Sequence, residues 1–400
     1  MSADLLRCLR WDIEGDRRLR NLTPGDWERL WAVIVEGNGH HLLARRLQRA
    51  LVDAPAPVAA GLRARAMAIA ARTLEGRGLL ARAIAETGRP ALLLKGVDLA
   101  ERLYGNLGHR PMGDVDLLVH AEDAMAYHAH FTRHGFVTSA PPSAELLALE
   151  ERHHLIYVPQ TGQGMPFEVH WRLSEARNDG PVDRAAIWRR ALAHPLAPGA
   201  RVMSHEDLFL YLCLHLKHHG FETPLTQLWD LAELLRAPAF PIDWPLLWHR
   251  AAEWRVAETV RVALFLVEDT LGVPADMLSG WRPDARLAAR LPDLLPSLGG
   301  YPPSAHAQGR LAAVLSPHGG WAERWRALRR GLVPTRFEVR SGYGRPDDGL
   351  WGDIRAYLRR YRRLIGTKGA TVRAWASGKG GVRGQIDRLE ALRRHLDERG

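Results

Sequence analysis

One stretch of sequence decides the fold: LLLKGVDLAERLYGNLGHRPMGDVDLLV, residues 92–119. It begins with an apolar run that ends at Lys95-Gly96, a pattern typical of a buried strand followed by a turn. Apolar residues at helical spacing follow over residues 97–105, and a second apolar run covers residues 113–119. The stretch therefore predicts a strand, a helix and a second strand in close succession.

The same pattern continues downstream of this stretch. Residues 121–135 have helical spacing, and residues 154–158 and 166–173 are rich in the alternating apolar and aromatic residues of strands. Because strands that alternate with helices build a sheet covered by helices, these residues predict a sheet domain over roughly 90–175.

The remaining segments with a clear pattern are helical. Helical spacing is found over residues 23–52, 57–87, 205–219, 224–237, 244–253 and 256–271. We therefore expect four parts: an N-terminal helical segment (1–89), a sheet-containing core (90–200), a helical accessory domain (201–300) and a basic helical C-terminal region (301–400).

The strongest chemical signal is the pair Asp114 and Asp116 in the second strand. Residues two apart in a strand point to the same face, so the two carboxylates should lie side by side. Two anions held together on an apolar strand repel each other, and a divalent cation relieves that repulsion. Oxygen ligands favour Mg²⁺ or Mn²⁺. The alternative is a solvated and inert pair at the exposed end of a strand.

Two further elements bear on this pair. A strand, a glycine turn and a helix at Lys95-Gly96 would present backbone N–H groups and a lysine charge to a phosphate; the alternative is an ordinary turn with a solvated lysine. In the later strand FEVHW (167–171), Glu168 and His170 share one face. A third carboxylate on a neighbouring strand is what a two-metal phosphoryl-transfer site requires.

These residues together resemble a known family. Residues 92–119, HHLIYVPQ (153–160) and FEVHWRL (167–173) resemble the uncharacterised nucleotidyltransferase branch of the DNA polymerase β-like superfamily, and residues 208–235 and 242–272 resemble its accessory helices. The resemblance implies an α+β fold, in which a polymerase β-like core, a small mixed sheet with helices, is flanked by N-terminal and C-terminal helical regions.

The resemblance also implies roles for individual residues. Asp114, Asp116 and Glu168 would be the catalytic carboxylates that bind Mg²⁺ (or Mn²⁺). Lys95-Gly96 would be the triphosphate-binding turn.

Arg110 would lie near the phosphates. The wider superfamily usually has Ser or Gly directly after the turn glycine, whereas Val97 follows here, so a hydroxyl contact to phosphate is missing.

By resemblance, the expected activity is metal-dependent transfer of a nucleoside monophosphate from an NTP to a hydroxyl or phosphate of a small molecule, peptide or protein, in natural-product or polysaccharide tailoring. Two alternatives keep the fold: transfer of a sugar or other group from an activated donor to a modified peptide, and a non-catalytic nucleotide-binding protein. His170, His215 and His219 are candidates for the acceptor side. The alternative for His215 and His219 is a pair of solvated or core-edge histidines.

Composition narrows the class of protein. Only Cys8 and Cys213 are present among 400 residues, which excludes a disulfide framework. No apolar run has the length of a membrane helix, and charges interrupt the N-terminal residues 1–18 where a signal peptide would be apolar. The sequence therefore predicts a cytoplasmic protein without a membrane partner.

The net charge of +10 is concentrated near the end of the chain. Residues 301–400 hold 21 Arg and Lys residues but only 9 Asp and Glu residues. The run Arg359–Arg363 could bind RNA or an acidic peptide, or it could be the basic outer face of a surface helix. An RNA acceptor therefore stays open, while a peptide or small molecule is the favoured one.

Overall fold

A computed structural model describes residues 7–36, 38–138, 153–173, 182–218 and 225–274, together with isolated positions outside these ranges. These segments belong to one compact unit, formed by Met1–His218 and Thr223–Asp284. The predicted basic region 301–400 lies outside the described residues except for isolated positions. The predicted domain boundaries stay predictions.

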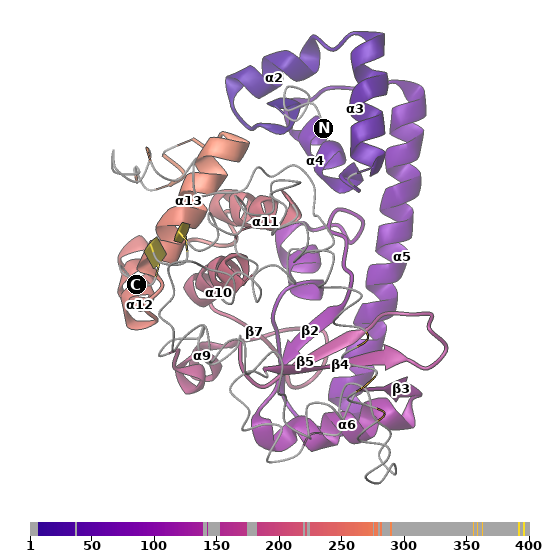
Figure 1. Cartoon of the computed structure of the whole chain (residues 1–400), viewed down its shortest axis with the longest axis vertical. Helices are drawn as coiled ribbons and strands as arrows, with labels where there is room; N and C mark the ends of the chain where they lie inside the picture. Colours follow the sequence, from indigo (N-terminus) through magenta and orange to yellow (C-terminus); the bar gives the residue numbers. More distant parts are fainter. Residues whose placement is uncertain are drawn as a thin grey trace. The chain divides into compact units, whose positions relative to one another are not determined.

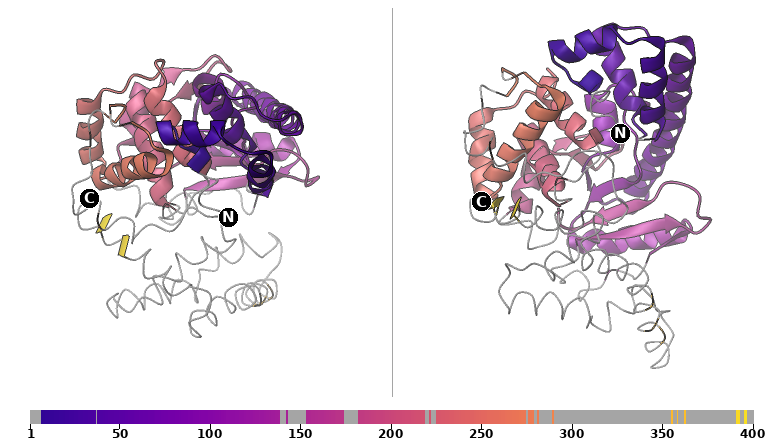
Figure 2. Two further views of the ribbon diagram at one scale, coloured as in Figure 1. Left: turned by 90° about the horizontal axis from the view of Figure 1, so that it is seen from above. Right: turned by 45° about the horizontal axis from the view of Figure 1, so that its top comes forward.

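Four α-helices precede the sheet. They are α2 (Ile13–Arg20), α3 (Pro24–Glu36), α4 (His40–Ala50) and α5 (Ala56–Thr87), after a short 3-10 turn at Arg7–Leu9. Asp12 caps α2 by accepting a hydrogen bond from the Gly15 N–H. Figures 1 and 2 show α2, α3 and α4 gathered beside one end of the long helix α5. The helices predicted at 23–52 and 57–87 are confirmed, the first of them as the pair α3 and α4.

Seven strands of the described residues form one mixed sheet, in the order β3-β4-β5-β2-β1-β7-β6. The strands are β1 (Ala91–Leu93), β2 (Val115–Leu118), β3 (Phe136–Val137), β4 (His154–Pro159), β5 (Phe167–His170), β6 (Leu192–Ala193) and β7 (Ala200–Val202). The pairs β1–β7 and β2–β5 are parallel, and the other neighbouring pairs are antiparallel. The predicted α+β fold, with a mixed sheet and flanking helices, is confirmed.

Helices α5 and α6 (Ala124–Arg133) cover one face of this sheet. Gly76 of α5 lies so close to β2 that an added Cβ would stand 3.0 Å from Val115 Cγ2. Phe131 of α6 packs with its ring centroid 4.9 Å from that of Tyr157 on β4 and 4.8 Å from that of Phe167 on β5. The apolar side chains of the sheet therefore pack beneath two helices, and the polar side chains of the same strands point to the opposite face.

The accessory helices follow the sheet. They are α10 (His205–His218), α11 (Leu225–Arg236), α12 (Trp244–Glu253) and α13 (Ala257–Leu271), after the short helix α9 (Arg184–Arg190). All four accessory helices were predicted with boundaries within two residues of these. Helix α10 is buried over nearly its whole length, from Glu206 to Leu214. None of the helices within the described residues combines the length and apolar character of a membrane span.

Two sequence expectations differ from the structure. The helix expected over residues 97–105 contains a π-helical turn, η2 (Leu99–Leu103). The short strands β3, β6 and β7 were not predicted, because a strand of two or three residues is too short to show an alternating pattern.

A buried ion pair joins the loop before β2 to helix α11. The Arg110 guanidinium donates hydrogen bonds of 2.9–3.2 Å to both carboxylate oxygens of Asp230, and the Tyr104 hydroxyl donates to Asp230 Oδ1 at 2.7 Å. Arg110 and Asp230 expose 8% and 1% of their side chains. Asp230 therefore has a structural role, as the buried hydrogen-bond acceptor that joins this loop to α11.

Removing this carboxylate charge should destabilise the fold strongly. Asp230→Asn leaves the Arg110 charge buried without its counter-ion, so we expect a loss of about 3–5 kcal/mol in the free energy of unfolding, measured by urea denaturation. Tyr104→Phe, which removes one hydrogen bond to the same carboxylate, should cost about 1.5–3 kcal/mol. Equal losses in the two variants would contradict the dominant role of the ion pair.

Candidate functional site

Strand register places the polar side chains of three strands on one face of the sheet. In the parallel pair β2–β5, Asp116 lies opposite Glu168. In the antiparallel pair β4–β5, His154 lies opposite His170. Since residues directly opposite each other share a face, and so do residues two apart, Asp116, Glu168, His170 and His154 all lie on the face that α5 and α6 leave uncovered.

Asp116 is the most buried of these side chains, with 1% of its side chain exposed. Its Oδ1 lies 3.4 Å from Lys95 Nζ and 3.4 Å from His170 Nε2. Among the described residues, neither of its carboxylate oxygens accepts a hydrogen bond. A buried carboxylate in this state keeps its lone pairs available for a cation.

The two aspartates differ in acidity. Burial and the neighbouring Asp116 charge raise the pKa of Asp114 to about 6. Burial also acts to raise the pKa of Asp116, but the Lys95 charge and the His170 ring outweigh it and hold that pKa well below its usual range. Without a bound metal ion, Asp116 therefore carries the negative charge of the pair below about pH 6. Asp114 loses its proton last, and both carboxylates are largely ionised at neutral pH.

Lys95 connects the sheet to helix α10. It follows β1, and its Nζ donates a hydrogen bond to His215 Nε2 at 2.8 Å. The other ring nitrogen of His215 lies 3.1 Å from Gln227 Oε1 on α11. His215 is therefore beside Lys95 and Asp116, whereas His219 lies outside the described residues.

Gly96 turns the chain directly after Lys95. Its φ of +55° is the left-handed conformation that glycine adopts most easily, and an added Cβ would stand 3.1 Å from Met112 Sδ. Both constraints favour glycine here, and they keep Lys95 at the end of β1 next to the acidic face.

Arg110 lies in the same region but pairs with another residue. Its hydrogen bonds go to both carboxylate oxygens of Asp230. Its expected contact with phosphate stays a prediction.

Two histidines of the site were missed by sequence reasoning. His153 directly precedes β4 and His154 begins it. His154 Nε2 lies 4.0 Å from Glu168 Oε1, and His170 Nε2 lies 3.4 Å from Glu168 Oε2. The signal was present in the sequence as adjacent histidines at the start of a strand, but only strand pairing shows that His154 meets His170.

The pKa values of the two paired histidines, His154 and His170, shift in opposite directions. Burial lowers the pKa of His170, but contacts with Asp116 and Glu168 overcome this and raise it to about 9. Burial and the neighbouring His170 charge lower the pKa of His154 to about 4. At neutral pH, a protonated His170 therefore helps Lys95 to balance the carboxylates.

The donor atoms of the site fit a divalent cation. Asp116, Glu168 and His170 each offer one ligand atom, and these atoms lie within 4.8 Å of one another. Asp114 adds a half-buried carboxylate directly before β2. Carboxylate oxygens are the ligands that Mg²⁺ and Mn²⁺ favour, so the residues present fit the expected metal.

Comparison with known proteins identifies one family. The family model described as "Uncharacterised nucleotidyltransferase" matches residues 23–272. The match covers helices α3–α5, the whole sheet and the accessory helices α10–α13. Curated proteins and solved structures give no match to the chain.

The acidity of His170 predicts how stability depends on pH in metal-free protein. Because its folded pKa of about 9 lies above the usual value of 6.5, its stabilising contact is fully present below pH 6.5 and is lost as the pH rises through 9. The decrease in the free energy of unfolding caused by His170→Gln should therefore be largest below pH 6.5 and become smaller toward pH 9. Urea denaturation of the parent and the variant in EDTA measures this difference.

The exposed His249 of α12 provides the control for this measurement. His249→Gln should change stability little over the same pH range, because an exposed ion pair contributes little. A loss in His170→Gln that stays constant from pH 6 to above 9 would contradict the assigned charge.

Proposed function

Because the chain belongs to the uncharacterised nucleotidyltransferase family, we propose that the site around Asp116 transfers a nucleoside monophosphate from an NTP to an acceptor hydroxyl or phosphate. Membership of the family supports nucleotidyl transfer as the general activity and an NTP as the substrate. The acceptor that we propose is a small molecule, peptide or protein, in keeping with a tailoring role.

The observation that carries this proposal is the buried Asp116 carboxylate, without a hydrogen bond from any described residue and facing Glu168 across the β2–β5 pair. We assign Asp114, Asp116 and Glu168 to hold Mg²⁺ or Mn²⁺. A bound metal would supply Lewis-acid stabilisation of charge on the phosphate oxygens. No other pair of neighbouring strands among the described residues places carboxylates opposite each other in this way.

We assign the donor phosphates to Lys95 and the Gly96 turn. Lys95 is a compact point charge, 16% exposed, at the edge of the acidic face. Its 3.4 Å separation from Asp116 Oδ1 places a cation and a metal-binding carboxylate side by side, as recognition of a metal-bound triphosphate requires.

We assign to Glu168 the role of the base that takes the proton of the acceptor hydroxyl. It is the most accessible carboxylate of the β2–β5 pair, with 21% of its side chain exposed. In the proposed reaction an acceptor oxygen bonds to the α-phosphorus, the bond from that phosphorus to the bridging oxygen of the β-phosphate breaks, and pyrophosphate leaves. The acceptor proton passes to Glu168. Catalysis is then mainly positioning and electrostatic stabilisation.

Loss of one aspartate should separate nucleotide binding from folding. In Asp114→Asn we expect Mg²⁺-dependent NTP binding to be lost, measured by calorimetry with each of the four NTPs. The metal-free variant should unfold cooperatively and be slightly more stable than the parent, because repulsion with Asp116 is relieved.

Asp183→Asn is the matched control, since Asp183 caps the distant helix α9 and asparagine caps equally well. It should bind Mg·NTP like the parent. Parent-like binding by Asp114→Asn would overturn the metal assignment.

Donor and acceptor roles should separate in kinetics. Glu168→Gln should lower kcat with little change in NTP affinity, because the lost stabilisation arises mainly in the transition state. Lys95→Ala should weaken NTP binding, and Lys95→Arg should not fully restore it, since a planar fork replaces a point charge. Each loss should amount to about 1.5–3 kcal/mol, or roughly ten- to a hundredfold.

Pyrophosphate release and acceptor mass, followed with each NTP and Mg²⁺, measure this turnover. Normal turnover by Glu168→Gln would exclude its proposed role. Binding of NTP without pyrophosphate release, in the presence of candidate acceptors, would instead favour a nucleotide-binding protein.

A further inference from the structure

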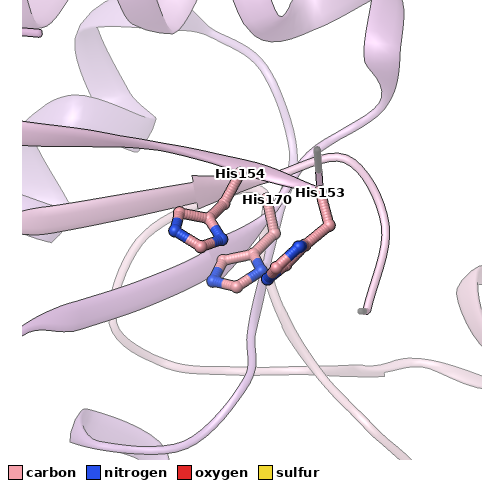
Figure 3. A group of neighbouring side chains, drawn as sticks. All are labelled: His153, His154 and His170. Carbon is pink, nitrogen blue, oxygen red and sulfur yellow. The ribbon is translucent and has the colours of Figure 1, made fainter. Parts of the chain in front are cut away.

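Three histidine rings gather beside the acidic face. Figure 3 shows His153, His154 and His170 with their imidazoles directed to the same side of β4 and β5. The ring centroids lie 4.2 Å apart for His153 and His154, 4.8 Å for His154 and His170, and 5.5 Å for His153 and His170. One ring nitrogen from each histidine lies within 4.8 Å of the other two.

Backbone pairing holds the three residues in place. His154 lies opposite His170 in the antiparallel pair β4–β5. The carbonyl of His153 accepts hydrogen bonds from the N–H groups of Trp171 and Arg172, at 2.9 and 3.3 Å. The cluster is therefore built on the ends of two paired strands, which are rigid supports for a ligand set.

Three buried imidazole nitrogens of His154 and His170 have no hydrogen-bond partner among the described residues. His170 exposes only 6% of its side chain, and neither its Nδ1 nor its Nε2 makes a hydrogen bond within the described part of the chain. The same holds for His154 Nδ1. Burial of such polar atoms costs free energy, which coordination to a metal ion recovers.

The chemistry of the cluster differs from that of the neighbouring carboxylates. Imidazole nitrogen is a ligand for Zn²⁺ and similar transition metals, whereas Mg²⁺ favours oxygen. Zinc–nitrogen bonds of about 2.0–2.1 Å require tetrahedral ligand atoms about 3.3 Å apart. The cluster's nitrogens lie within 4.8 Å of one another, so each pair would have to approach by at most about 1.5 Å to reach this separation.

We propose that His153, His154 and His170 form a transition-metal site of the three-histidine type, which takes Zn²⁺ next to the carboxylate site. Three protein ligands leave a fourth position open for water or a substrate oxygen. His154 Nε2 lies 4.0 Å from Glu168 Oε1, so the bound ion sits beside the carboxylate assigned to the acceptor. The site does not depend on nucleotidyl transfer and is testable without any nucleotide.

A second histidine cluster provides an internal comparison. Glu86, His130 and His134 also place ligand atoms within 4.8 Å of one another, but Glu86 and His134 are already paired at 2.8 Å and are 41% and 31% exposed. Because these groups are solvated and partnered, we expect this cluster to bind Zn²⁺ more weakly. A variant of His134 distinguishes Zn²⁺ bound at this cluster from Zn²⁺ bound at the proposed site.

The experiment measures metal binding by the full chain without an affinity tag, stripped with EDTA and free of nucleotide. Zn²⁺ affinity and stoichiometry are determined by competition with a chromophoric chelator. The parent should bind one tight equivalent, and His154→Asn should lower the affinity at least about tenfold, since even loss of a residue that supports a ligand costs 10- to 100-fold. Zn²⁺ should raise the Tm of the parent but not that of His154→Asn.

Matched controls exclude a general effect of removing a histidine. His128 contacts β4 from the opposite face, with its Nδ1 3.2 Å from the Tyr157 hydroxyl, and His128→Asn should keep the tight equivalent. His134→Asn, which dismantles the other cluster, should also keep it. Loss of the tight equivalent in His134→Asn and not in His154→Asn would overturn the proposal.

The parent alone gives a further readout if His154→Asn fails to fold. Co²⁺ in the proposed site should give the intense visible absorption of a tetrahedral ion, and Zn²⁺ should displace it. Absence of a tight equivalent, or the weak spectrum of an octahedral ion, would overturn the three-histidine site. These measurements contain neither nucleotide nor Mg²⁺, so failure of the three-histidine site is distinguishable from failure of the proposed nucleotidyl transfer.

Discussion

Burial of the Asp116 carboxylate is the constraint on which the site depends. Removing a carboxylate from water costs several kcal/mol unless positive charge and donors replace the solvent. Lys95 and His170 supply that charge, each 3.4 Å from Asp116 Oδ1. They come from the ends of β1 and β5, the two strands that flank β2, so the charge balance is satisfied only when these three strands are paired in register.

The opposite face of the sheet makes this polar arrangement stable. Val115 and Phe167 alternate with Asp116 and Glu168 along the same strands and pack beneath α5 and α6. The close approach of Gly76 to Val115 shows how tightly α5 lies on β2. A shift of one residue in strand register would exchange the two faces and bury the carboxylates under the helices, so the apolar packing also fixes the position of the acidic groups.

Sequence reasoning identified the elements whose signals are local. The strand with Asp116, the partner strand with Glu168 and the accessory helices all follow from periodicity within short segments. Pairing across the chain could not be predicted in the same way. Arg110 meets Asp230 across 120 positions of sequence, and His154 meets His170 only because β4 and β5 pair in one register. A single sequence contains no information on such partners beyond residue type.

The position of His170 links the two proposed metal sites. It belongs to the oxygen-rich set with Asp116 and Glu168 and also to the imidazole set with His153 and His154. Its ring has two nitrogens, but coordination by one changes the charge and orientation of the other. Because His170 is shared, the two binding equilibria are coupled. An ion bound by the imidazole set changes the affinity of the carboxylate set for Mg²⁺, and Mg²⁺ changes the affinity of the imidazole set for its ion by the same factor. The charge that Asp116 and Glu168 present to Mg²⁺ is therefore set in part by what His170 binds.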